Sequence, residues 1–261
     1  MGKFSEKELI LGSFPWSFSR VNSYESCPRM FKLTYIEKVN KVNNAFAEFG
    51  IYCHKILEMY YNGEVDFFEL SQIYEDGYNN SVTLSFPPNK YVDLADTYYD
   101  QGKDYFNKFE GIRPASNVIG VEEKVRYQIG GYDFMGYIDL ILEFDGKISV
   151  IDHKSKKNFK SEEEKEKYLR QLYLYGGYIK EKYGVYPKYL IFNMFRAQDT
   201  IVEIFDTKKL EEANEWFIST IKKIYKDKKF KVNKSQFFCD YICSVRESCY
   251  VSKSYCKKGA G

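Results

Sequence analysis

The 261-residue sequence lacks several features that would define its class at once. No apolar stretch approaches the roughly 18 residues that a membrane-spanning helix needs, so we expect no membrane span. The N-terminus has no long apolar run after its first charges, which is unlike a signal peptide, and we therefore expect a cytoplasmic protein. No glycine-rich loop carries the lysine of a phosphate-binding motif, which excludes a nucleotide-driven motor of that type.

The sequence also has no strong excess of either positive or negative charge. The 39 basic and 37 acidic residues leave a formal net charge of +2, so no global positive charge announces a nucleic-acid partner. Basic residues gather locally at 154–160 and 222–234, and local patches matter more than the sum. Aromatic residues make up 18% of the chain, and core packing is the expected role for most of them, with base stacking as a second use.

The cysteines, in contrast, are clustered. Cys239, Cys243 and Cys249 form a C-x3-C-x5-C pattern near the C-terminus. Disulfides are disfavoured in a cytoplasmic protein, so this spacing indicates a metal or iron–sulfur site. Cys27 stands directly before Pro28, which predicts a bend or a new helix start and a plausible place for a further ligand.

Hydrophobic periodicity and turn residues predict an α/β chain. Helices dominate the first part, three strands joined by tight turns follow, and a helix, two strands and a final helix complete the order. The expected helices span 17–35 (with a break at Pro28), 45–61, 66–80, 91–110, 162–183 and 207–229, and the expected strands span 118–129, 132–144, 146–153, 185–196 and 200–205.

The stretch from 136 to 157 carries the residues that point to chemistry. It reads as a strand, a tight turn at Asp145-Gly146 and a second strand. Asp139 lies on the first strand, and Asp152 and Lys154 lie two residues apart on the second, so those two share one face. Carboxylates suit a hard divalent cation that activates water, and a nearby lysine stabilises developing negative charge. An Asp-x-Lys pattern alone would equally describe exposed charges at the end of a hairpin.

Other polar residues could contribute to the same region. Gln171 and Tyr175 are four residues apart on the helix after the hairpin, so they share a face. His54 lies on the second expected helix, where a lone histidine is usually a packing residue. Glu122 and Glu123 lie on the first expected strand; one could face the site, but a solvated surface position is the favoured interpretation.

Taken in order, these motifs resemble the RecB-like branch of the PD-(D/E)XK nuclease superfamily. The matching pattern is a helix histidine, a Gly-x-x-Asp strand, an Asp-x-Lys strand end and a Gln-x-x-x-Tyr helix: His54, Gly136, Asp139, Asp152, Lys154, Gln171 and Tyr175. Each motif is weak alone, but four in the right order on the right elements make a strong joint signal. The resemblance implies an α/β fold with a mixed central sheet flanked by helices and a restriction-endonuclease-like αβββαβ core.

The resemblance also implies a role for each residue. The implied ligands of Mg²⁺ or Mn²⁺ are His54, Asp139, Asp152 and the backbone carbonyl of His153. Lys154 would be the catalytic lysine beside the two acids. Gln171 and Tyr175 would hold the DNA strand near the metal.

The cysteines extend the resemblance to iron–sulfur-stapled nucleases, namely the AddB-type helicase–nuclease subunits and the CRISPR-adaptation nucleases. A [4Fe–4S] cluster is implied on Cys27, Cys239, Cys243 and Cys249. The usual trio in those proteins is C-x2-C-x5-C, whereas the first gap here is three residues, so Cys256 could replace one member and zinc is an alternative. Cys53 is expected to be a small buried hydrophobe.

These observations predict one nuclease domain over 1–261, with a mainly helical part at 1–115, a catalytic core at 116–206 and a helix and cysteine tail at 207–261. The expected activity is metal-dependent exonuclease hydrolysis of single-stranded or end-containing DNA in recombination, repair or mobile-element processing, with a helicase, recombination or CRISPR-adaptation protein as partner. The alternatives are an endonuclease using the same site, an idle DNA-binding module stapled by a cluster, and a redox iron–sulfur protein. The intact acids and lysine disfavour the idle module, and a redox role leaves them unexplained.

Overall fold

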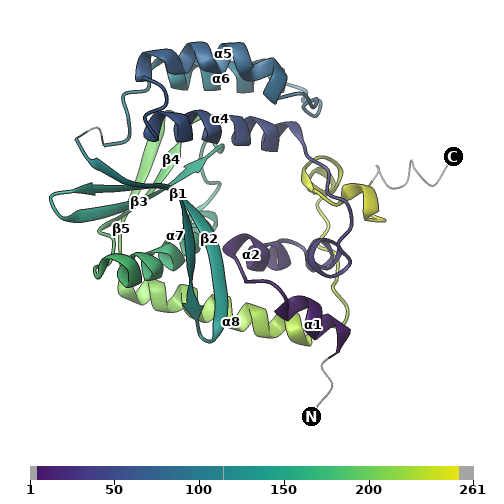
Figure 1. The fold of residues 1–261 in the computed structure, drawn as a ribbon. Coiled ribbons are helices and arrows are strands. Elements are labelled where there is room, and N and C mark those ends of the chain that lie inside the picture. Colours follow the sequence, from purple (N-terminus) through teal and green to yellow (C-terminus); the bar gives the residue numbers. More distant parts are fainter. Residues whose placement is uncertain (1–4, 114, 253–261) are drawn as a thin grey trace. The chain divides into compact units, whose positions relative to one another are not determined.

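The computed structural model describes residues 5–113 and 115–252. Its helices are α1 (Glu6–Gly12), α2 (Phe18–Ser26), α3 (Pro28–Phe31), α4 (Ala45–Tyr61), α5 (Leu70–Ser81), α6 (Leu94–Asn107), α7 (Glu162–Tyr183) and α8 (Thr207–Lys226), and its strands are β1 (Asn117–Ile129), β2 (Tyr132–Phe144), β3 (Lys147–Lys154), β4 (Tyr189–Met194) and β5 (Asp199–Ile204). Within the described residues the strands form one sheet in the order β1-β2-β3-β4-β5. The β3–β4 pair is parallel, whereas β2–β3 and β4–β5 are antiparallel, so the predicted mixed sheet flanked by helices is confirmed (Figure 1).

The chain divides into two compact units. The described residues of 45–125 and 136–213 form the sheet unit, and those of 1–44, 126–135 and 214–261 form the cysteine unit. Strands β1 and β2 pass from one unit into the other, because the turn that joins them belongs to the cysteine unit. The assignment of the whole chain to a single nuclease domain stays a prediction.

Strand β3 is the centre of the sheet unit. It is buried along most of its length, as expected for a strand that pairs in parallel on one side and has helices over both faces. The turn before it, Asp145-Gly146, has positive φ at both residues, which matches the right-handed twist of a two-residue hairpin. Helices α4, α5 and α6 cover one face of the sheet and α7 covers the other (Figure 1).

Helix α7 has clear start and stop signals. The Ser161 hydroxyl accepts the backbone N–H of Glu164, and three glutamates occupy the first turn, where the positive end of the helix dipole stabilises acids. Gly184 ends the helix in the left-handed conformation at φ 75°. These ends fix the rotation of α7, and with it the face that carries Gln171 and Tyr175.

The cysteine unit has an aromatic core. Trp16 stacks on Phe31, and Phe134 packs edge-on against Phe217. Pro28 is the first residue of α3 and Cys27 separates α2 from α3, as the sequence predicts. Helix α1 was not expected from the sequence, although Ser5 and Glu8 form the reciprocal capping bonds that mark a helix start.

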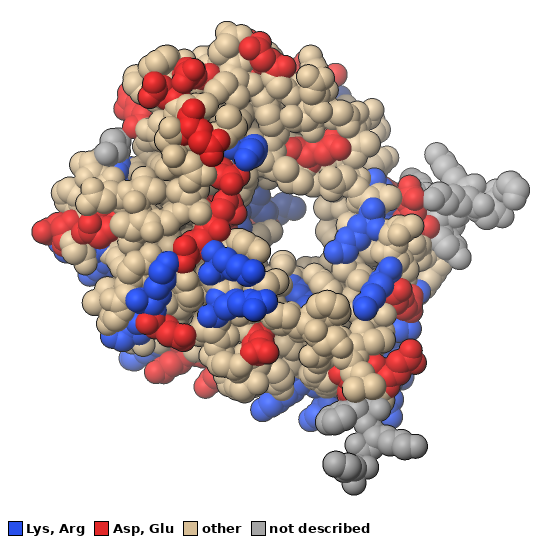
Figure 2. Space-filling view, in the orientation of Figure 1, with Lys and Arg blue, Asp and Glu red and all other residues tan. Residues whose placement is uncertain are grey.

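The surface agrees with the small net charge. The face drawn in Figure 2 carries both signs of charge, with a run of acidic side chains next to several basic ones. Among the described residues, no helix combines the length and the apolar character that crossing a membrane would require.

Candidate active site

The candidate site is built around the backbone of His153 near the end of β3. The N–H of His153 donates to Asp139 Oδ2 at 2.6 Å, and its carbonyl oxygen lies 2.9 Å from His54 Nε2. His54 Nδ1 lies 3.6 Å from Asp139 Oδ2. Helix α4 and the paired strands β2 and β3 therefore bring together the histidine, the first acid and the carbonyl that the sequence motifs single out.

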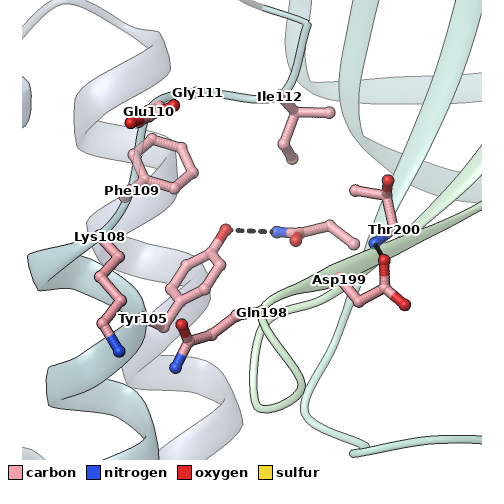
Figure 3. Close-up of a pocket in the computed structure, with 10 residues that line it drawn as sticks. Tyr105, Lys108, Phe109, Glu110, Gly111, Ile112, Gln198, Asp199 and Thr200 are labelled. Atoms are coloured by element: carbon pink, nitrogen blue, oxygen red, sulfur yellow. Dashed lines mark hydrogen bonds between the residues drawn. The ribbon is translucent and has the colours of Figure 1, made fainter.

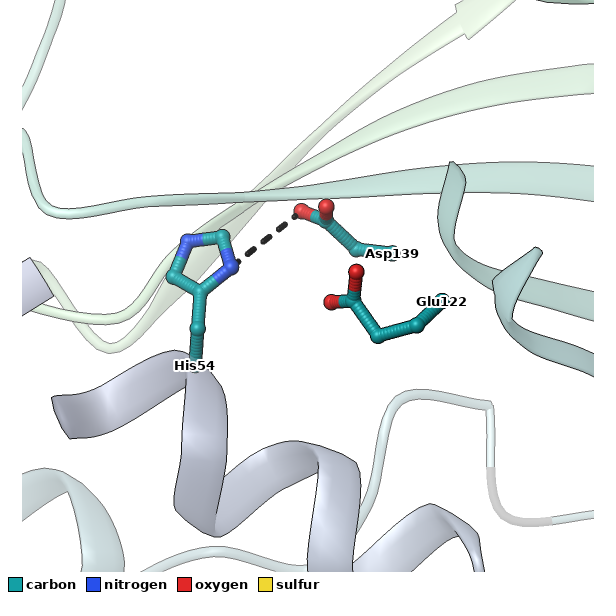
Figure 4. A group of neighbouring side chains, drawn as sticks. All are labelled: His54, Glu122 and Asp139. Atoms are coloured by element: carbon teal, nitrogen blue, oxygen red, sulfur yellow. Dashed lines mark ion pairs between the residues drawn. The ribbon is translucent and has the colours of Figure 1, made fainter. Parts of the chain in front are cut away.

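Glu122 also joins this group. One ligand atom each from His54, Glu122 and Asp139 lies within 4.8 Å of the others, and Figure 4 shows the three side chains converging. The alternative that one of the two glutamates faces the site therefore holds for Glu122, in place of the favoured solvated position, whereas Glu123 pairs away from the site with Tyr178 and Lys182 on α7. The φ of Glu122 is +47°, which interrupts the regular alternation of β1 and could not be read from the sequence.

Burial of these groups has a clear electrostatic consequence. Burial and the nearby Asp139 carboxylate raise the pKa of Glu122 to about 7. Burial, and then Asp152, likewise hold the pKa of Asp139 well above its ordinary value, although the His153 N–H opposes the rise. Burial lowers the pKa of His54, so its imidazole stays neutral and keeps a lone pair for a metal. The charges of several acids are thus crowded into a poorly solvated space that a cation would stabilise.

Asp152 and Lys154 form the second half of the site. Asp152 is buried, with 4% of its surface exposed, and its Oδ2 pairs with Lys154 Nζ at 2.6 Å. Burial alone would lower the pKa of Lys154, but the Asp152 and Asp139 carboxylates hold it above its ordinary value. Lys154 is therefore an ammonium fixed beside the acids, as the shared strand face predicts.

Helix α7 adds a polar contact to that lysine. Gln171 Oε1 lies 3.5 Å from Lys154 Nζ, and Gln171 Nε2 donates to the Tyr175 hydroxyl at 3.1 Å. Tyr175 is buried, and a Cβ added to Gly136 would lie 2.7 Å from its ring, so the glycine of the strand motif makes room for this tyrosine. Tyr175 thus packs on the sheet and orients Gln171, while Gln171 faces the lysine.

The donor set fits a divalent cation. Carboxylates, a neutral imidazole and a backbone carbonyl are oxygen and nitrogen ligands of the kind that Mg²⁺ or Mn²⁺ accepts. The 2.9 Å between His54 Nε2 and the His153 carbonyl also matches two adjacent ligands of one ion, which lie about 3 Å apart when each is about 2.1 Å from the metal.

The predicted cysteine ligands also lie near one another, within the cysteine unit. Cys27, Cys239, Cys243 and Cys249 are all buried free thiols. Burial raises the pKa of Cys243 to about 11, and the thiols of Cys249, Cys27 and Cys239 contribute to the rise. The Cys27 sulfur accepts the backbone N–H of Asn233 at 3.5 Å. Cys256 lies outside the described residues, and Cys53 is buried in the sheet unit as expected.

Comparison with known proteins places this arrangement in a family. The profile described as "PD-(D/E)XK nuclease superfamily" matches residues 15–250. The chain belongs to the PD-(D/E)XK nuclease superfamily. The predicted superfamily is thereby confirmed, and the motif residues on β2, β3 and α7 lie within the matched range. No curated protein matches the chain.

Solved structures share the fold of this chain. Matches extend to 21 chains. One of them is the crystal structure of a protein from Eubacterium rectale named "Putative exonuclease", with a TM-score of 0.52 and 12% sequence identity. That alignment covers 87% of this chain and 86% of the other. At this identity the likeness concerns the fold, and it includes most of both chains.

Proposed function

We propose that the chain is a Mg²⁺- or Mn²⁺-dependent deoxyribonuclease that degrades DNA from an end. The observation that carries the proposal is the convergence of His54 and Asp139 on the two backbone groups of His153, with the Asp152–Lys154 ion pair on the same strand. Superfamily membership supports nuclease chemistry in general. The metal requirement, the DNA substrate and the end dependence are the specific parts of this proposal.

In this proposal the residues have separate tasks. The cation would be held by His54, Asp139, Asp152 and the His153 carbonyl, with Glu122 as a further carboxylate. When bound, it polarises the phosphate and makes hydroxide available at neutral pH. Because its pKa lies above the ordinary value, Lys154 acts mainly as an ammonium that stabilises negative charge on the phosphate. Gln171 would hold the Lys154 ammonium in place and position the DNA strand.

Exonuclease action is favoured over endonuclease action because the similar fold from Eubacterium rectale belongs to a protein named as an exonuclease. The test compares linear and covalently closed circular single-stranded DNA, each with Mn²⁺ and with EDTA. We expect degradation of the linear strand with Mn²⁺ alone. Equal degradation of the circle would assign an endonuclease, and activity undiminished in EDTA would overturn the metal mechanism.

The same assay separates an enzyme from an idle DNA-binding module. Asp152→Asn keeps the size of the side chain and removes its charge. A contaminating nuclease would stay active in preparations of this variant, so loss of activity assigns the cleavage to this chain. We expect the unaltered chain to cleave and this variant not to cleave. DNA ends of the required kind arise in recombination, repair and mobile-element processing, where a helicase, a recombination protein or a CRISPR-adaptation protein would supply the substrate.

For the cysteine unit, we infer that Cys27, Cys239, Cys243 and Cys249 bind one [4Fe–4S] cluster. Burial and the neighbouring thiols raise the pKa values of Cys243 and Cys249, so a bound metal would relieve this crowding because coordination removes the thiol protons. An N–H donated to Cys27 Sγ suits a thiolate ligand. Anaerobically purified protein should contain iron and acid-labile sulfide and absorb visible light. One stoichiometric zinc in colourless protein would assign the alternative.

A further inference from the structure

Behind the candidate site, three buried polar side chains are linked in series. Asn193 Nδ2 donates to His153 Nδ1 at 3.0 Å and to the Tyr105 hydroxyl at 2.7 Å. The exposed fractions of His153, Asn193 and Tyr105 are 4%, 2% and 6%. Figure 3 shows the Tyr105 hydroxyl pointing at the amide, with the hydrogen bond drawn as a dashed line. We call these three residues the His153 support.

The His153 support is apolar on its core side, whereas Tyr105 and Asn193 also line a pocket together with polar residues such as Lys108, Gln198 and Asp199 (Figure 3). The core cluster on this side of the sheet includes Leu140, Leu142, Ile151, Ile191 and Phe195. A polar group in such a layer costs free energy unless its hydrogen bonds are made, whereas apolar residues would pack there without that condition. Packing of this face therefore does not require the His153 support.

The geometry fixes the His153 ring from several sides. His153 and Asn193 are direct partners in the parallel β3–β4 pair, so their side chains lie next to each other on one face. The two amide hydrogens of Asn193 match its two acceptors, the His153 ring and the Tyr105 hydroxyl. The Tyr61 ring lies nearly parallel to the His153 ring, with centroids 6.4 Å apart and 15° between the planes. A fixed ring restricts the rotation of the His153 backbone.

That backbone is what the candidate site uses. The His153 N–H holds the Asp139 carboxylate and its carbonyl faces His54, so a rotation at this residue would move both contacts at once. We propose that Asn193 and Tyr105 are positioning residues for metal binding, which act by fixing His153 and do not touch the metal or the DNA. The inference rests on the metal site of the proposed function and adds the residues that hold its geometry.

The first test is Asn193→Leu, which keeps the side-chain size and removes both hydrogen bonds. Mn²⁺ is titrated into the full chain while the EPR signal of the free ion is recorded, so that affinity is measured without catalysis. Loss of an outer-shell partner typically weakens metal affinity 10–100-fold, and we expect a change of about that size. Cleavage should show a higher Mn²⁺ concentration at half-maximal rate, with kcat largely restored at saturating Mn²⁺.

A matched pair of tyrosine variants provides the control. Tyr105→Phe removes the outer hydroxyl of the His153 support. Tyr74→Phe removes another buried hydroxyl of the same helical layer, one that bonds to the Tyr99 carbonyl at 3.0 Å and lies outside the support. We expect Tyr105→Phe to weaken Mn²⁺ binding several-fold and Tyr74→Phe to leave it unchanged, with similar losses of thermal stability.

The possible results separate the two proposals. Unchanged Mn²⁺ affinity in Asn193→Leu and Tyr105→Phe would overturn the positioning role and assign the His153 support to packing. If Asn193→Leu does not fold, the two tyrosine variants decide the question by themselves. If the unaltered chain binds no Mn²⁺, the proposed metal site fails first, and that result is distinct from a failure of the support.

Discussion

The two candidate metal-binding groups of this protein are held in different ways. In the sheet unit, His54 lies on α4 and the two aspartates lie on β2 and β3. Backbone hydrogen bonds fix the register of these strands. In the cysteine unit, Cys27 lies between two helices, and Cys239, Cys243 and Cys249 lie on or beside short helical turns. The first group is part of regular structure, whereas the second lies where regular structure is short.

This difference predicts a different role for the proposed metal in each unit. The carboxylates of the sheet unit already have protein partners, because Asp139 accepts from the His153 N–H and Asp152 pairs with Lys154. The cysteines pack in a small cluster in which Cys243 and Cys249 are joined by Leu33 and Val245. A metal in the sheet unit should therefore matter for chemistry, and a metal in the cysteine unit should matter for folding.

The largest effect is expected for the lysine of the sheet unit. Lys154→Met should lower kcat on linear DNA by about 10³-fold, which is within the usual range for a positioned charged group, while the fold is kept. Lys165→Met is the matched control, because Lys165 also lies in ion pairs and its side chain is 16% exposed, as is that of Lys154. Lys165→Met should stay within about twofold of the parent rate, since side chains outside the site contribute little. More than a tenth of the parent rate in Lys154→Met would contradict its assigned role.

The next effect concerns stability in the cysteine unit. If the proposed cluster is present, Cys239→Ala should abolish iron binding and lower the free energy of unfolding by about 3 kcal/mol, because metal binding by thiolates is coupled to folding. Cys53→Ala, in the core of the sheet unit, should keep the iron and lose roughly 1 kcal/mol from the small cavity. Iron analysis and denaturant titration check both variants. Equal losses of stability, with iron retained in both, would argue against the difference between the units.

A smaller effect is expected on the pH dependence of stability, because burial raises the pKa of Glu122. Folding raises the pKa of Glu122 from 4.5 to about 7, so its protonated form is favoured in the folded state. The stability that this group contributes is therefore present below about pH 4.5 and is lost as the pH rises through about 7. In EDTA, Tm should fall by about 2–4 °C across that window, and Mn²⁺ should reverse the trend because it binds the ionised form.

Two substitutions on the same strand test this pH dependence and provide its control. Glu122→Gln should flatten the change of Tm between pH 5 and 7 and weaken Mn²⁺ binding about tenfold. Glu123→Gln should do neither, because Glu123 pairs with Lys182 and Tyr178 on α7. Thermal melts at several pH values provide the measurement. A parent chain whose Tm in EDTA rises over this window would show that the burial of Glu122 does not dominate.

The sequence predicts this site where its determinants are local. Helix α4 and strand β2 have the predicted bounds, because helical periodicity and glycine turns are written within a few residues. The shared face of Asp152 and Lys154 follows from strand alternation alone. The roles of Glu122 and Asn193 depend on a local left-handed residue and on the register of β3 with β4. Neither has a local sequence signal, so Glu122 could be named only as one of two possible site residues, and Asn193 could not be predicted.

The smallest effect should separate the two residues of the α7 pair. Gln171→Leu removes the contact to the Lys154 ammonium and should lower kcat about tenfold, with Mn²⁺ affinity unchanged, since the lost interaction is one of positioning. Tyr175→Phe keeps the ring that packs against Gly136 and removes the hydroxyl that orients Gln171, so a loss of about twofold is expected.

Tyr175→Ala completes the argument about this pair. It would leave a cavity beside Gly136, and large-to-small changes of an aromatic residue cost about 3–5 kcal/mol. We therefore expect a clear loss of Tm and little change of kcat below the melting temperature. Rates are measured on single-stranded DNA at saturating Mn²⁺ and at a temperature where every variant is folded. If Tyr175→Phe loses as much activity as Gln171→Leu, the tyrosine hydroxyl contacts the DNA itself. If Gln171→Leu is silent while Lys154→Met is inactive, the ion pair with Asp152 is enough to hold the lysine.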